Sequence, residues 1–133
     1  MSENKNSDNE NTALAAELPR RVDKPWGWEI HWAHTDKYVG KILHVKAGQA
    51  LSFQYHRVKE ETIYVQSGRI MLTRAEPDGE PQKVEMGPGD VLHVPPGLRH
   101  RFEALEDTDL LEASTPELDD VVRLEDRYGR DEG

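Results

Sequence analysis

The sequence predicts an all-β protein, a single barrel built from short strands. From Trp26 onward, apolar and polar residues alternate with a period of two, the repeat of a strand that buries one face. Turn-forming Gly, Pro and Asp residues interrupt this alternation about every 8–12 residues, the spacing typical of sandwiches and barrels. No segment up to residue 114 has the 3.6-residue apolar repeat of an amphipathic helix.

Nine strands are expected between the turns KAGQ, QSG, EPDGEP, MGPGD, PPGL and LEDTD and the shorter loops around them. They cover residues 27–33, 38–46, 51–56, 62–66, 69–75, 82–85, 91–94, 100–104 and 108–113. Residues 121–127 (VVRLEDR) fit neither period well, so this segment is open between a last strand and a short helical turn.

The first 18 residues differ in composition from the rest. They are rich in Asn, Ser and Glu and contain no aromatic residue, so they cannot bury enough apolar surface to offset the entropy of ordering. We expect a disordered lead-in over residues 1–18 and one domain over residues 19–130, which includes a C-terminal strap. A chain of 133 residues is long enough for one compact domain.

The charge is unevenly distributed. The chain has 26 acidic and 17 basic residues, and residues 103–133 alone hold 12 acidic residues against three arginines, so the earlier part is neutral. No basic run occurs, which argues against nucleic acid or an anionic membrane as a partner. The absence of cysteine excludes disulfides, thiolate zinc sites and cysteine nucleophiles. Without a long apolar stretch, we expect a soluble, cytoplasmic protein.

Four side chains form a candidate metal site. Alternation places Gln54 and His56 on one face of the strand 51–56, and Glu61 follows after a four-residue turn. His100 comes just after a Pro-Gly turn in a second hairpin. Such nitrogen and oxygen ligands suit a divalent zinc, manganese, iron, cobalt or nickel ion and leave coordination positions open. Glu60 would point to the opposite face from Glu61 and is interpreted as a solvated charge.

The spacing of these residues resembles a known family. The two segments read Gly48-x5-Gln54-x-His56-x4-Glu61-x6-Gly68 and Gly89-x5-Pro95-x-Gly97-x2-His100, which together resemble the two cupin motifs. The resemblance implies a single-domain double-stranded β-helix, or jelly-roll barrel, with a metal at its mouth. His56, Glu61 and His100 match the ligand positions, and Gln54 stands where most cupins have histidine.

Three further strings narrow the resemblance: KPWGWEI, KILHVKAGQALSFQYH and VVRLEDRYGR. They resemble the cupin domain of type II mannose-6-phosphate isomerases, in which glutamine occupies the first ligand position, over residues 24–130. The resemblance implies a metal-dependent aldose–ketose isomerase acting on a phosphorylated sugar, with proton transfer between C1 and C2 through a cis-enediol. Because cupins commonly form dimers, a homodimer is also expected.

Three cationic residues are candidates for the reaction itself. If Leu43 and Val45 face the interior, Lys41 does too, and it would act as a base or bind a phosphate; alternatively it is a rim lysine with its ammonium in water. Arg123 and Arg130 lie in the C-terminal segment, where a guanidinium suits a phosphate if the segment packs on the barrel. The other interpretation of this segment is an acidic solubilising tail.

Two other functions remain open at this stage. One is an oxidative cupin of the dioxygenase type, in which iron at the same site activates dioxygen. The other is a non-catalytic cupin that binds a sugar or metabolite. Among the remaining histidines, His93 is a candidate for supporting the metal ligands, and His31, His34 and His44 are interpreted as structural. The three tryptophans are expected in the core or in a dimer contact.

Overall fold

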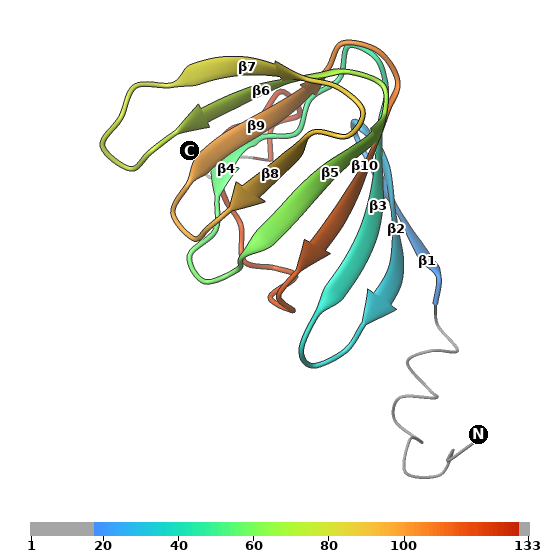
Figure 1. Ribbon diagram of the computed structural model, residues 1–133. Helices are drawn as coiled ribbons and strands as arrows, with labels where there is room; N and C mark the ends of the chain where they lie inside the picture. Colours follow the sequence, from blue (N-terminus) through green and yellow to red (C-terminus); the bar gives the residue numbers. More distant parts are fainter. Residues whose placement is uncertain (1–17, 131–133) are drawn as a thin grey trace, which may run out of the picture.

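The computed structural model describes residues 18–130, and they form strands and turns without a helix (Figure 1). The all-β prediction is therefore confirmed. The strands are β1 (Arg20–Lys24), β2 (Gly27–His34), β3 (Val39–Val45), β4 (Phe53–Tyr55), β5 (Glu61–Ser67), β6 (Ile70–Ala75), β7 (Gln82–Met86), β8 (Val91–Val94), β9 (Arg99–Ala104), β10 (Thr108–Ser114) and β11 (Val122–Glu125).

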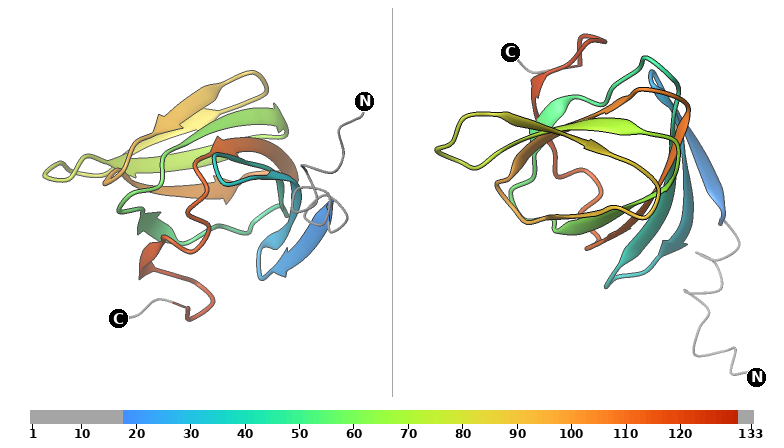
Figure 2. Two further views of the ribbon diagram at one scale, coloured as in Figure 1. Left: turned by 90° about the horizontal axis from the view of Figure 1, so that it is seen from below. Right: turned by 45° about the horizontal axis from the view of Figure 1, so that its top comes forward.

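The strands form two antiparallel sheets that face each other, as the views in Figures 1 and 2 show. One sheet has the order β1-β2-β3-β10-β5-β8 and the other the order β11-β4-β9-β6-β7. Neighbours in both sheets are distant in sequence, for example β3 with β10 and β4 with β11. This crossing of the chain between two sheets is the jelly-roll arrangement.

The space between the sheets contains an apolar part and a polar part formed by buried charged residues. Val45, Val65, Ile70 and Leu110 are fully buried in the apolar part. In the same strands or beside them, the charged residues Lys41, Lys59, Glu61 and Glu112 are also buried. Because buried charges require partners, the polar part is the place to look for function.

All nine expected strands are present, with ends that differ by at most two residues. One strand was missed: β1 has the sequence RRVDK, with a single apolar residue, and lies exposed at the edge of its sheet. Residues 122–125 form a strand that pairs with β4, which decides the open alternative for the C-terminal segment. The expected disordered lead-in lies outside the described residues apart from Leu18, so it and the boundary at residue 19 stay predictions. No helix in the described part of the chain is long and apolar enough to cross a membrane.

The turn between β5 and β6 offers a test of the backbone. Gly68 has φ +90°, and a Cβ there would lie 2.6 Å from Thr108 Cα, whereas Gly48 has φ +82° with nothing within 4 Å. We expect Gly48→Ala to lower the free energy of unfolding by about 1–2 kcal/mol, the cost of the left-handed conformation. Gly68→Ala should cost about 1–3 kcal/mol more because the backbone of β10 must move. Urea unfolding of both variants checks this, and equal losses would contradict the close approach at Gly68.

Candidate metal centre

A cavity lies between the two sheets in the polar part of the interior. Its wall is formed by β2, β3, β5, β10 and the end of β1 on one side, by β4 and β9 on the other, and by part of the C-terminal segment. The charged and metal-ligating side chains that line it are Lys24, Glu29, Lys41, His56, Lys59, Glu61, His100, Glu112, Arg123 and Arg130. Pockets with several converging polar groups are typical of binding and active sites.

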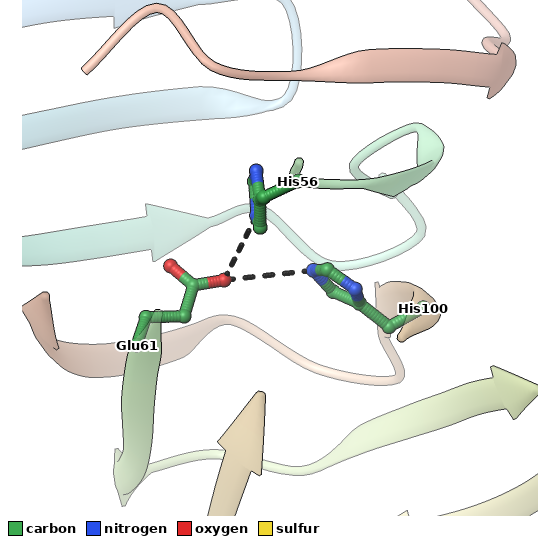
Figure 3. A group of neighbouring side chains, drawn as sticks. All are labelled: His56, Glu61 and His100. Atoms are coloured by element: carbon green, nitrogen blue, oxygen red, sulfur yellow. Dashed lines mark hydrogen bonds and ion pairs between the residues drawn. The ribbon is translucent and has the colours of Figure 1, made fainter. Parts of the chain in front are cut away.

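Three of the predicted ligands meet in this cavity. His56 follows β4, Glu61 begins β5 and His100 lies in β9, and all three are buried. The Oε2 atom of Glu61 lies 3.2 Å from Nε2 of His56 and 3.5 Å from Nε2 of His100 (Figure 3). One ligand atom of each residue lies within 4.8 Å of the others, which is compact enough to surround one ion.

Backbone carbonyls orient both imidazoles. Nδ1 of His56 lies 2.6 Å from the carbonyl oxygen of Asp120, and Nδ1 of His100 lies 2.9 Å from that of Leu98. A carbonyl only accepts hydrogen bonds, so each Nδ1 carries the proton and donates it. In the neutral ring, Nε2 is then a bare lone pair, and both lone pairs point at the Glu61 carboxylate. Such a support for the distal nitrogen is typical of metal-binding histidines.

The charge on Glu61 completes the argument. Burial raises the pKa of Glu61. Hydrogen bonds from His100 and His56, when these carry a proton on Nε2, and the charge of the Lys59 ammonium outweigh burial and hold that pKa well below its usual range. An ionised oxygen that faces two bare nitrogens is stable only if a positive charge lies between them. A second proton on an imidazole supplies that charge, and so does a divalent cation. This donor set of two imidazoles and one carboxylate therefore fits a divalent metal.

Gln54 lies beside the group formed by these three residues. It is on β4, directly opposite His100 in the ladder with β9, and its side chain lines the same cavity. Its role as a fourth ligand stays a prediction. Glu60 is exposed, as expected, and pairs with His93 at 2.6 Å on the outside of the sheet. The interpretation of His93 as a support for the metal ligands is therefore wrong. In β8 the buried side chains are those of Leu92 and Val94, so the side chain of His93 between them lies on the solvent face.

Lys41 is buried and lines the cavity, so it is not a rim lysine with its ammonium in water. Its Nζ lies 3.3 Å from Oε1 of Glu29, and the same oxygen accepts a hydrogen bond at 2.8 Å from Nε2 of His31. Arg20 donates to Nδ1 of His31 at 3.1 Å, which leaves His31 neutral. Burial lowers the pKa of His31, in agreement with that assignment. The Lys41–Glu29 ion pair thus faces the cavity with a fixed orientation.

A second buried ion-pair cluster was not predicted. Lys59 contacts Glu61 at 3.3 Å and Glu112 at 3.1 Å. Burial lowers the pKa of Lys59, but Glu112 and Glu61 outweigh it and raise the pKa to about 12. Burial and the charge of Glu61 raise the pKa of Glu112. Glu112 lies two residues after the buried Leu110 in β10 and therefore on the same face of the strand, a signal that could have identified it as buried. Lys59 lies in a turn, where periodicity does not predict the direction of a side chain.

The two predicted arginines both line the cavity from the C-terminal segment. Arg123 lies in β11, opposite Gln54 in the ladder with β4. Arg130 is engaged by Asp126, which accepts hydrogen bonds from its Nε at 2.8 Å and its Nη2 at 3.1 Å. These hydrogen bonds hold the pKa of Asp126 below its usual value. The segment is therefore part of the cavity wall and not a free tail.

Asp120 connects the C-terminal segment to the loop between β4 and β5, and a substitution there should show how much this connection stabilises the protein. Its carboxylate accepts hydrogen bonds from the backbone N–H groups of Arg57, Val58 and Lys59 at 2.7–3.0 Å. Since Asp120 is partly exposed, we expect Asp120→Asn to lower the free energy of unfolding at neutral pH by about 1–2 kcal/mol. Asp119→Asn, at an exposed neighbour, is the matched control.

The same variant has a defined pH dependence. Burial raises the pKa of Asp120, but the three N–H groups outweigh it and lower the pKa from the ordinary 3.8. The stabilisation is therefore complete above pH 3.8 and is lost as the pH falls through the folded-state pKa. Unfolding measured between pH 7 and pH 2 should show Asp120→Asn converging on the parent protein only at the acid end. A difference that is constant over this range would contradict the assignment.

Glu61 provides the direct test of the metal-binding group. Glu61→Gln removes the charge but keeps the shape, and we expect it to weaken binding of added manganese or zinc at least about tenfold, the loss that even an outer-shell partner causes. Glu60→Gln, its exposed neighbour, should bind metal like the parent protein. Metal content after dialysis and the metal-dependent rise in melting temperature check this. Equal metal binding by the two variants would exclude Glu61 as a ligand.

Comparison with known proteins agrees with this geometry. The model of the Cupin_2 family, described as a cupin domain, matches residues 41–112. The chain is 34% identical over 118 residues to mannose-1-phosphate guanylyltransferase ManC of Salmonella typhimurium, covering 85% of this chain and 24% of that protein. It is 34% identical over 68 residues to oxalate decarboxylase of Arthroderma benhamiae, covering 51% of this chain and 16% of that protein.

The fold also has relatives among solved structures. The structure of oxalate decarboxylase from Bacillus subtilis superposes with a TM-score of 0.72 at 18% identity, over 81% of this chain and 30% of that one. The chain spans about a quarter or less of the length of the curated relatives named above. The family match covers the segments that carry His56, Glu61 and His100. The chain is thus a member of the cupin family with a single jelly-roll domain.

Proposed function

We propose that this protein is a metal-dependent aldose–ketose isomerase that acts on a phosphorylated sugar. The observation that carries the proposal is that one cavity combines a metal-binding group with several cationic side chains. Sugar-phosphate chemistry is supported by the sequence resemblance to mannose-6-phosphate isomerases over residues 24–130. It is also supported by the similarity to ManC, whose name refers to mannose 1-phosphate.

In this proposal His56, Glu61 and His100 hold the metal, with Gln54 as the fourth protein ligand. A bound divalent cation would polarise the carbonyl and hydroxyl oxygens of the sugar. The protein's own contribution is orientation: carbonyls of Asp120 and Leu98 hold the imidazoles, and Lys59 holds Glu61. These supports keep the three ligands in place before a substrate arrives.

Proton transfer between C1 and C2 is assigned to the Lys41–Glu29 pair. Lys41 is the predicted catalytic residue, and its ion pair with Glu29 provides a donor and an acceptor 3.3 Å apart in the cavity wall. Burial raises the pKa of Glu29, but Lys41 and His31 outweigh it and hold the pKa below the usual value, so Glu29 is ionised. The Glu29 carboxylate can then take the proton from one carbon and return it to the other, while the Lys41 ammonium donates a hydrogen bond to the sugar oxygen on which negative charge develops.

The charge of the cavity favours an anionic substrate. Five cationic side chains and three acidic ones line it, and a divalent metal would add further positive charge. Arg123 and Arg130 are the predicted residues for the phosphate, since guanidinium groups bind phosphate oxygens in pairs.

A second candidate is an oxidative cupin. It is supported by the 34% identity to an oxalate decarboxylase over an alignment that covers about half of this chain. The same cationic cavity also suits a small carboxylate. The third candidate, a non-catalytic cupin that binds a sugar or metabolite, shares the site and differs only in turnover. A cytoplasmic location and a homodimer complete the proposal.

An assay with metal-loaded protein tests the reaction. We expect mannose 6-phosphate, or a related aldose phosphate, to be converted to the ketose phosphate. Lys41→Met should lower kcat by about 10²-fold or more, the usual contribution of a positioned acid or base, while metal content stays unchanged. Lys37→Met, at an exposed lysine before β3, is the control.

Three results would contradict the isomerase proposal. Binding of the sugar phosphate without any turnover would favour the binding protein. Dioxygen uptake or carbon dioxide release with a carboxylate substrate would favour the oxidative cupin. Full activity of Lys41→Met would remove Lys41 from the reaction.

A further inference from the structure

The cations of the cavity differ in whether their charge is already matched. Lys59 pairs with Glu61 and Glu112, Lys41 pairs with Glu29, and Arg130 pairs with Asp126. Among residues 18–130, no carboxylate lies within ion-pair distance of the remaining two, Lys24 and Arg123. Both are only partly exposed. Within the described part of the chain, these two side chains therefore carry the unmatched positive charge of the cavity.

Lys24 and Arg123 come from opposite sheets. Lys24 is the last residue of β1, the edge strand of the six-stranded sheet, and Arg123 lies in β11, the edge strand of the five-stranded sheet. Both side chains line the cavity, so they reach it from the edge strands of the two sheets. An anion that contacts both side chains would link these two strands.

The surroundings of Lys24 point in the same direction. Burial lowers the pKa of Lys24, and the charges of Lys41, Arg130 and Arg123 lower it further, against the opposing effect of Glu29. Cations crowded together in a partly buried place are stabilised by an anion. The Oγ atom of Ser52, in the same cavity, is buried and has no hydrogen-bond partner in the described structure. It lies two residues before Gln54, and its free hydroxyl suits a ligand with polar groups.

We propose that Lys24 and Arg123 together bind the terminal anionic group of the ligand, whereas the guanidinium of Arg130 is already paired with Asp126. Lys24 would then determine specificity for an anionic ligand over a neutral one. This inference rests on the proposed function, in which the anionic group is the phosphate of the sugar. It revises the sequence-based expectation, which assigned the phosphate to Arg123 and Arg130 and gave Lys24 no role.

The experiment measures binding of three probes to the metal-loaded protein by calorimetry: mannose 6-phosphate, glucuronate and mannose. Lys24→Gln and Arg123→Gln should each weaken binding of mannose 6-phosphate about tenfold or more, the usual effect of losing a charge-assisted hydrogen bond. Binding of mannose and metal content should not change. Arg21→Gln is the matched control, because Arg21 lies on the same strand but outside the cavity, exposed and paired with Asp23.

A further variant guards against a fold defect. Lys24→Arg keeps the charge and should retain most of the affinity, so a loss in Lys24→Gln with retention in Lys24→Arg identifies the charge as the cause. The inference is overturned if Lys24→Gln binds mannose 6-phosphate as tightly as Arg21→Gln does. It is equally overturned if Lys24→Gln weakens the binding of mannose by the same factor as the binding of mannose 6-phosphate. It is also overturned if the parent protein binds neither anionic probe more tightly than mannose.

The outcomes separate this inference from the proposed function. Tighter binding of glucuronate than of mannose 6-phosphate, with loss of that preference in Lys24→Gln, would support the anion-binding pair but contradict a sugar-phosphate isomerase. Turnover of mannose 6-phosphate that survives Lys24→Gln with unchanged KM would support the isomerase and contradict the role of Lys24.

Discussion

The carboxylate of Glu61 lies in the interior of the protein, against two imidazoles and one ammonium group. A charge removed from water in this way is stable only if other groups surround it, and here they come from two separate segments: the loop after β4, with His56 and Lys59, and β9, with His100. Glu112 of β10 in turn pairs with Lys59. Each of these segments is then held in place by the requirement to satisfy that charge. The same arrangement leaves two nitrogen lone pairs and one oxygen directed at a common point, where a cation completes the set.

The C-terminal segment, whose strand β11 is the edge strand of the five-stranded sheet, also supports this arrangement. Asp120 orients His56 through its carbonyl and the following loop through its carboxylate, and Tyr128 packs against the apolar core and donates a hydrogen bond to Gln49. Strand β11 of this segment runs beside β4 (Figure 2). The region that holds the acidic surplus of the sequence therefore also forms part of the cavity wall. Charge composition alone describes such a segment as a tail, because composition does not report contacts.

The limits of sequence-based inference are visible in β2. The strand reads GWEIHWAH, and its alternation correctly predicts a strand, but Glu29 and His31 face the interior while Trp32 is 57% exposed. Periodicity separates the two faces of a strand without telling which one is buried. The polar face is turned inward here because Lys41 on β3 and Arg20 on β1 provide partners for Glu29 and His31. None of these partners is close in sequence to the residue that it satisfies.

The sequence by itself determined the fold class, nine of the strands and the membership of His56, Glu61 and His100 in one group, because alternation, turn residues and motif spacing are local properties of the chain. Only the tertiary structure decided that Glu29, Lys59 and Glu112 are buried partners of that group and of Lys41. It also decided that Arg130 is already paired whereas Lys24 and Arg123 are not. Ion pairing depends on which strands become neighbours across the two sheets, and that arrangement results from long-range contacts that no local pattern encodes.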